Sequence, residues 1–86
     1  MDLKRQIFHA RMQYPNHILL FRLGDFVHAF NEDAQPVADA ISGYVHTLIG
    51  MPSAAFPYSK AEIEVSKIIA AGYAVQRFEI LNDIRA

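Results

Sequence analysis

The stretch ILLFRLGDFVHAFNEDAQPVA, residues 18–38, decides the fold of this chain. Residues 18–23 are almost wholly apolar, as in a strand that is covered on both faces, and Gly24-Asp25 then predicts a two-residue turn. The chain therefore doubles back into a second strand over residues 26–30. Because side chains alternate along a strand, we expect Val27 and Ala29 to face one way and the other three residues to face the other, namely Phe26, His28 and Phe30.

Two helices flank this hairpin. The first is expected to run from a cap at Asp2 to about Gln13, with apolar side chains at helical spacing. Pro36 decides where the second helix begins, because with Asp33 as the cap the proline falls in the first turn, where its missing N–H costs nothing. Gly43 is expected to supply the left-handed residue that ends this helix.

A third helix has the clearest local signal in the chain. Residues 59–62, Ser-Lys-Ala-Glu, form a capping box, and Tyr58 and Ile63 stand where a hydrophobic staple would close across it. Ser59 is therefore explained as a helix cap and not as a nucleophile. The helix is expected to end at Gly72 and to turn four apolar residues inward: Ala61, Val65, Ile68 and Ile69.

Two further segments complete a sheet. Residues 44–49 have the composition of a strand, and a turn at residues 50–52 is expected to lead into a short extended segment that ends at residues 56–58. Residues 73–81 are expected to form the last strand, with a bulge near Gln76-Arg77 because its apolar residues change face there. This order of elements predicts a single small α/β domain, residues 1–86, with a mixed β-sheet packed with about three helices.

Composition limits the classes of function. The apolar fraction of 52% is high for 86 residues, so we expect part of that surface to stay exposed for a partner or a second copy. Cysteine is absent, which excludes a disulfide scaffold, and the longest apolar run is too short to cross a membrane, so we expect a cytoplasmic protein. A net charge of −1 and a pI near 6.4 argue against an autonomous nucleic-acid binder.

Enzyme chemistry has little support in the sequence. The four histidines lack the close paired spacing that seats zinc, so no metal site is expected. The chain has no GxxxxGK[ST] phosphate loop, so we expect neither ATP binding nor ATP hydrolysis, and no other cofactor is implied. Asp25 and Glu79 could both lie at sheet ends, but nothing indicates a catalytic pair.

The hairpin within residues 18–38 resembles the N-terminal mismatch-recognition domain of the MutS family, in which a strand, a turn and a strand present a phenylalanine that wedges into duplex DNA. The resemblance extends over nearly the whole chain. Asp33-Ala34 matches the family's acidic-alanine start of the second helix. Pro52, Ala54 and Pro57-Tyr58 resemble its proline and tyrosine run before the third helix, and Ala71-Gly72-Tyr73 with Glu79 resembles its last helix-to-strand step. It implies a fold like that of MutS domain I and a Phe26 that contacts DNA.

This chain also departs from the family pattern. The family's wedge motif is phenylalanine, any residue, glutamate, in which the glutamate hydrogen-bonds the displaced base, whereas here the three residues are Phe26, Val27 and His28. Residues 44–50 stand where the family has a basic, glycine-rich hairpin, and Ser59 replaces a histidine. The family continues beyond this region into connector, clamp and ATPase domains.

Each candidate residue has two interpretations. Phe26 is either a minor-groove wedge or a phenylalanine packed in the core or in a subunit contact. His28 either hydrogen-bonds a base edge or a phosphate, or is a strand histidine without function. Basic residues form a phosphate track if the fold gathers them and are otherwise a solvated surface; they are Arg22, Lys60, Lys67 and Arg77.

Two functions follow from these interpretations. The first is a non-catalytic module that contacts mismatched or distorted duplex DNA through Phe26, with His28 in the position of the glutamate. The second is a protein-interaction module that dimerises, or docks on a repair protein, through an aromatic surface that includes Phe26, Phe56 and Tyr58. A DNA reader should gather its basic residues beside Phe26, and an interaction module need not.

Overall fold

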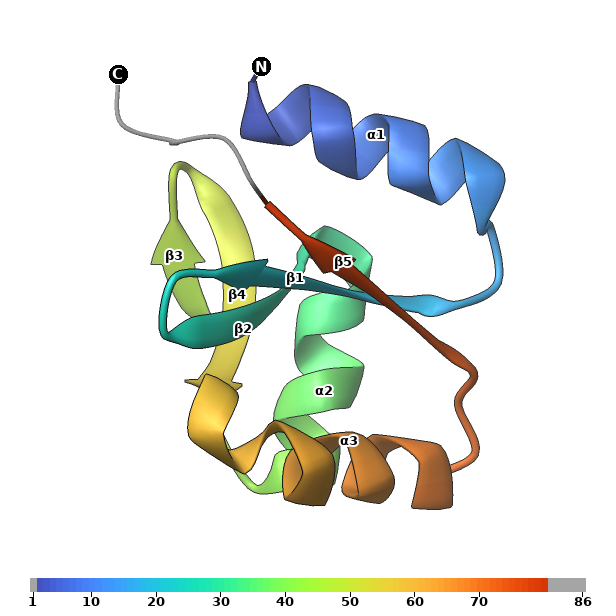
Figure 1. Cartoon of the computed structure of the whole chain (residues 1–86), viewed down its shortest axis with the longest axis vertical. Helices are drawn as coiled ribbons and strands as arrows, with labels where there is room; N and C mark the ends of the chain where they lie inside the picture. The colour runs from blue at the N-terminus through green and yellow to red at the C-terminus, as the bar shows by residue number, and fades with distance from the viewer. Residues whose placement is uncertain (1, 81–86) are drawn as a thin grey trace.

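In the computed structural model, which describes residues 2–80, a five-stranded sheet lies between α1 on one side and α2 and α3 on the other (Figure 1). The elements in chain order are α1 (Leu3–Gln13), β1 (Ile18–Leu23), β2 (Phe26–Phe30), η1 (Asn31–Asp33), α2 (Ala34–Ile41), β3 (His46–Leu48), β4 (Met51–Pro57), η2 (Tyr58–Lys60), α3 (Ala61–Ala70) and β5 (Val75–Glu79). The strand order is β3-β4-β2-β1-β5, in which β5 runs parallel to β1 and the other pairs are antiparallel. This confirms the predicted mixed α/β sheet packed with helices.

Alternate residues of β1 enter two separate cores. Ile18 and Leu20 belong to the core that the sheet forms with α2 and α3. Leu19 and Phe21 belong to the core that the sheet forms with α1. Both faces of β1 are therefore buried, which explains why its sequence lacks the polar alternation of a half-exposed strand.

The same two-sided burial explains β5 without a bulge. The strand pairs with β1 in continuous parallel register over all five of its residues. Val75 packs against the core of α2 and α3, whereas Phe78 and Ile80 pack against the core of α1. The predicted bulge near Gln76-Arg77 is therefore wrong, because a strand covered on both sides can be apolar on both faces. Leu81, the predicted end of this strand, lies outside the described residues.

The ends of α1 and α2 agree with the sequence only in part. Asp2 caps α1 as predicted, because its Oδ1 accepts a hydrogen bond of 3.0 Å from the backbone N–H of Lys4. Helix α2 ends at Ile41, and the residue after it, Ser42, adopts the left-handed conformation with φ +58°. This conformation was predicted for Gly43. The helix therefore ends one residue earlier than its glycine suggests.

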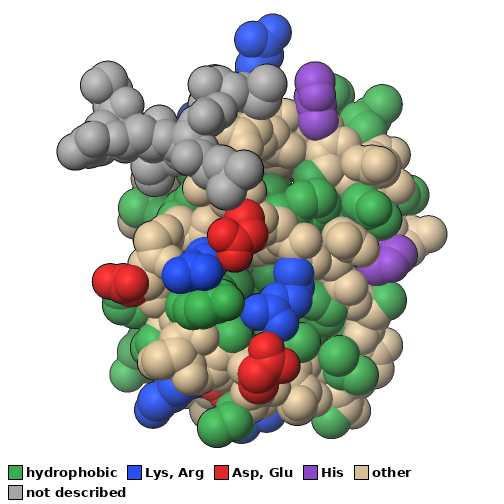
Figure 2. Space-filling view, in the orientation of Figure 1, with side chains coloured by type: hydrophobic (Ala, Val, Ile, Leu, Met, Phe, Trp, Pro, Cys, Tyr) green, Lys and Arg blue, Asp and Glu red, His purple; other side chains and the backbone are tan. Residues whose placement is uncertain are grey.

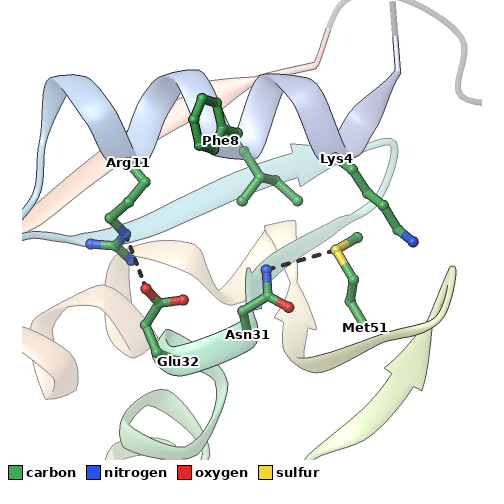
Figure 3. A pocket seen from close by; sticks show the side chains of 7 residues that line it. Lys4, Phe8, Arg11, Asn31, Glu32 and Met51 are labelled. Atoms are coloured by element: carbon green, nitrogen blue, oxygen red, sulfur yellow. Dashed lines mark hydrogen bonds and ion pairs between the residues drawn. The ribbon is translucent and has the colours of Figure 1, made fainter.

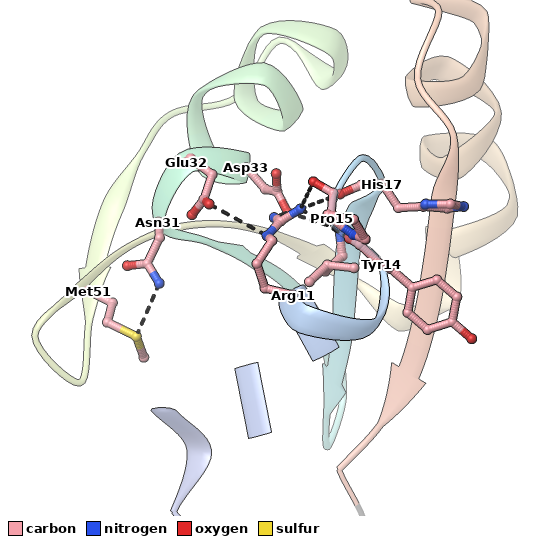
Figure 4. A network of polar contacts seen from close by, with 9 residues as sticks. Arg11, Tyr14, Pro15, His17, Asn31, Glu32, Asp33 and Met51 are labelled. Carbon is pink, nitrogen blue, oxygen red and sulfur yellow. Dashed lines mark hydrogen bonds and ion pairs between the residues drawn. The ribbon is translucent and has the colours of Figure 1, made fainter. Parts of the chain in front are cut away.

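The Asp33 carboxylate holds α1 against the sheet and does not cap α2 (Figure 4). It accepts a hydrogen bond of 2.9 Å from the backbone N–H of Leu19 and forms an ion pair with the guanidinium of Arg11. Burial raises the pKa of Asp33, while the Leu19 amide and Arg11 act in the opposite direction. Arg11 also pairs with Glu32 and donates to three backbone carbonyls, those of Tyr14, Pro15 and His17. Asp33 stands at the N-cap position and α2 begins at Ala34 as predicted, but its side chain does not cap the helix because this carboxylate has charged and buried partners elsewhere in the fold.

Helix α3 does not begin with the predicted capping box. Ser59 lies within the short turn η2, the helix begins at Ala61, and no side chain caps it. The backbone N–H of Tyr58 instead donates a hydrogen bond of 2.7 Å to the carbonyl of Asp25, in the turn of the first hairpin. This contact between distant parts of the chain fixes the residues before the helix.

The side chains around α3 also differ from the prediction. Ile63 and Ile69 are both exposed, so the staple with Tyr58 is not formed and Ile69 does not face inward. The ring of Tyr58 lies 3.5 Å from the guanidinium carbon of Arg22, measured to the ring centroid. The other inward residues of the helix are buried as predicted: Ala61, Val65 and Ile68.

The second hairpin is shifted relative to the sequence prediction. Only His46–Leu48 of the predicted residues 44–49 form a strand. The turn consists of Ile49 and Gly50, with φ +52° and +72°, and Met51 and Pro52 already belong to β4. Two successive left-handed residues are typical of the turns that join tightly paired antiparallel strands.

Candidate functional site

Helix α1 packs on one face of the sheet but does not cover all of that face. Phe26, His28 and Phe30 of β2 lie on that face, and antiparallel register places β4 residues directly beside them. Phe30 is 2% exposed beneath α1, whereas Phe26 at the other end of the strand is 49% exposed. We call the uncovered end the open sheet face and define it by five residues: Leu23, Phe26, His28, Ala55 and Pro57.

Phe26 stands at the edge of this face because of the turn before it. Gly24 has φ +64°, and a Cβ there would meet no atom within 4 Å, so backbone conformation is what requires the glycine. Phe26 follows as the first residue of β2, between Leu23 of β1 and Pro57 of β4. The predicted sharing of one face by Phe26, His28 and Phe30 is confirmed, since Val27 and Ala29 enter the opposite core.

The ring of His28 is held in a fixed orientation. It stacks on Phe30, with ring centroids 5.5 Å apart and planes inclined by 7°, and its Nδ1 lies 3.1 Å from Oγ of Ser53. Burial lowers the pKa of His28 below its ordinary value of 6.5, so the imidazole is neutral at neutral pH. A neutral imidazole can donate a hydrogen bond from one ring nitrogen and accept one at the other.

Two of the predicted basic residues, Arg22 and Arg77, do not share the face of Phe26. Arg22 and Arg77 lie on the opposite face of the sheet, because they alternate with residues that face α1. Arg22 pairs with Glu79 at 3.3 Å, and Arg77 pairs with Glu62 at 3.3 Å. The two arginines and Tyr58 line one small cavity of about 70 Å³, while the exposed Lys60 lies in η2. Basic and acidic side chains likewise lie next to one another on the surface shown in Figure 2.

Two other aromatic predictions have different outcomes. Phe56, predicted as part of an exposed aromatic surface, is 2% exposed and belongs to the core of α2 and α3, so that prediction is wrong. Tyr58 is exposed, but its ring is occupied by the guanidinium of Arg22.

A depression of about 410 Å³ separates α1 from η1 and the start of β4 (Figure 3). It lies at the end of β2 away from Phe26, because Asn31 follows the last residue of that strand. Within it, Glu32 pairs with Arg11 and the amide of Asn31 donates to the sulfur of Met51 at 3.8 Å. The depression was not predicted, because it depends on how α1 crosses the sheet.

Among residues 2–80, no three histidine or acidic side chains are grouped closely enough to hold a metal ion. Within the same part of the chain, no helix is long and apolar enough to span a bilayer.

Comparison with known proteins agrees with the fold. The family model of MutS domain I matches residues 2–86. The DNA mismatch repair protein MutS of Chlorobium chlorochromatii is 36% identical over 80 residues, that of Methanosarcina acetivorans 34% over 85 residues, and that of Thermotoga neapolitana 38% over 73 residues. These matches cover 92%, 92% and 85% of this chain but 9% of each relative.

Proposed function

This chain belongs to the MutS domain I family, and we propose that it is a non-catalytic module that contacts mismatched or distorted duplex DNA through Phe26. The observation that carries the proposal is the half-exposed Phe26 ring at the first position of β2. Proteins that bend DNA insert apolar side chains of this kind between base steps. The ring belongs to a strand that is paired on both sides, so its backbone is fixed before DNA arrives.

The ion pairs of the arginines support weak binding to DNA with a preference for distorted duplexes. Phosphate neutralisation by lysine and arginine supplies most of the affinity of DNA-binding proteins. Arg22 and Arg77 already have the acidic partners Glu79 and Glu62 and lie on the face opposite Phe26. We therefore expect low affinity, a shallow dependence on salt, and a preference for duplexes in which a base step is already weakened.

The experiment is a fluorescence anisotropy titration of labelled duplexes at low salt: matched, mismatched, and with a single-base bulge. Phe26→Ala should remove the preference for the mismatched and bulged duplexes. Phe8→Ala is the matched control, because Phe8 is an exposed phenylalanine of α1 outside the open sheet face. Undetectable binding of the unaltered chain to every duplex would overturn the proposal for the isolated domain.

A protein-interaction module, either a homodimer or a domain that docks on a repair protein, is the second candidate. It is favoured by Phe8 and Met12, which are four residues apart on α1 and are 61% and 70% exposed. Sedimentation velocity over a range of concentrations tests the homodimer. A strict monomer at the highest concentration would contradict it, and association that Met12→Ser weakens would support it.

A further inference from the structure

Ser53 and His28 form an isolated hydrogen-bonded pair beside Phe26. Ser53 is 3% exposed, and within residues 2–80 the hydrogen bond of its hydroxyl is the one to Nδ1 of His28, at 3.1 Å. Register explains the contact, because Ser53 of β4 faces Phe30, the residue on which His28 stacks.

Burial of the hydroxyl decides which partner donates. A serine hydroxyl carries one proton, and leaving that proton buried without an acceptor costs more than leaving a lone pair unused. Ser53 therefore donates its proton to Nδ1 of His28. A neutral imidazole that accepts at Nδ1 carries its own proton on Nε2.

The surroundings of His28 favour the neutral ring. Its register partners are Phe21 on β1 and Ala55 on β4, and its ring lies against Phe30, so none of these neighbours carries a charge. Among the described strand residues, the titratable side chain on the same face as His28 is His46 on β3, the register partner of Ser53. Burial lowers the pKa of His28, in agreement with a ring that accepts at Nδ1.

The other ring nitrogen remains available to a ligand. In the described part of the chain, Nε2 of His28 has no hydrogen-bond partner, yet it is not among the buried polar atoms that lack one. His28 is partly exposed and lies on the same face of the strand as Phe26, two residues away.

We propose that Ser53 is a positioning residue that fixes the tautomer of His28, so that the Nε2–H group donates a hydrogen bond to an acceptor atom on the base displaced by Phe26. The inference rests on the proposed function and specifies its chemistry. An ionised carboxylate at this position could only accept, whereas the imidazole donates. The acceptors that face a minor-groove wedge are N3 of purines and O2 of pyrimidines, and these are the atoms it would recognise.

The tautomer is tested without DNA, by ¹⁵N-resolved NMR of the histidine rings as a function of pH. We expect the proton on Nε2 in the unaltered chain and in Ser53→Thr, which keeps the hydroxyl. Ser53→Ala should raise the pKa of His28, because the lost hydrogen bond stabilises the neutral ring. A proton on Nδ1, or a His28 pKa that falls or stays constant in Ser53→Ala, would overturn the inference.

The base contact is tested with a mismatched duplex that carries a 3-deazapurine, which lacks the N3 acceptor. The unaltered chain should lose about 2- to 10-fold in affinity relative to the parent duplex, the effect of one hydrogen bond, and His28→Phe should show no difference. Equal affinity for both duplexes, together with a mismatch preference that depends on Phe26, would overturn this inference alone. Absence of binding to every duplex would overturn the proposed function as well.

Discussion

Replacing Phe26 by alanine separates a wedge from a core residue. Full burial of a phenylalanine side chain contributes about 1.5 to 3 kcal/mol, and Phe26 is already 49% exposed in the folded chain. The truncation should therefore lower the free energy of unfolding by about 1 kcal/mol. Because the ring lies at the start of β2, on a face that α1 does not cover, its loss leaves no enclosed cavity.

Phe56→Ala provides the comparison from the neighbouring strand. Phe56 is 2% exposed, so its truncation should cost about 3 to 5 kcal/mol. Urea unfolding followed by circular dichroism measures both variants, and anisotropy measures duplex binding. A loss of stability in Phe26→Ala as large as that in Phe56→Ala would refute the reasoning from exposure. A Phe26→Ala variant that keeps its mismatch preference would refute the wedge.

Urea unfolding also tests three other features of the fold. Asp2→Ala should cost about 1 kcal/mol because Asp2 caps α1, whereas Ser59→Ala should change stability by less than about 0.5 kcal/mol; equal losses would contradict the assigned helix starts. Asp33→Asn should cost about 1 to 3 kcal/mol, because it removes the ion pair with Arg11 and weakens the bond to Leu19; a neutral result would contradict the network. Since burial lowers the pKa of His28 below 6.5, the unfolded chain binds its proton more tightly, and stability should fall as pH decreases through 6.5. His28→Phe should reduce that dependence, and an unchanged slope would contradict the assignment.

Local patterns predicted the hairpin because its signals lie within a few residues. An apolar run, a glycine-aspartate turn and the period of two are enough to place Phe26 and His28 on one face. Helix caps were predicted less well, because groups far away in the sequence can bind the side chain that would otherwise cap the helix. Helix α2 begins at Ala34 as predicted, but the carboxylate of Asp33 binds Leu19 and Arg11 and does not cap it. Tyr58 is held by the hairpin turn, and α3 begins at Ala61 without the predicted Ser59 cap.

The surroundings of the candidate site depend on register, which the sequence does not reveal. Ser53 is 25 residues from His28, and Glu79 is 57 residues from Arg22. Neither contact has a local signal, although a pairing of β2 with β4 would have indicated Ser53 as a neighbour of His28. The basic residues were predicted as a possible track because their acidic partners come from other elements: Glu62 from α3 and Glu79 from β5.

In the proposed function the two faces of the sheet have different roles. An apolar ring and a neutral imidazole lie on one face, where they can distinguish a weakened base step from a stacked one. Arg22 and Arg77 lie on the other face, and a phosphate that approached either would have to replace a carboxylate, which exchanges one anion for another with little gain. Under the proposed function the two arginines therefore add little affinity, and tight binding to DNA would require cations other than these two.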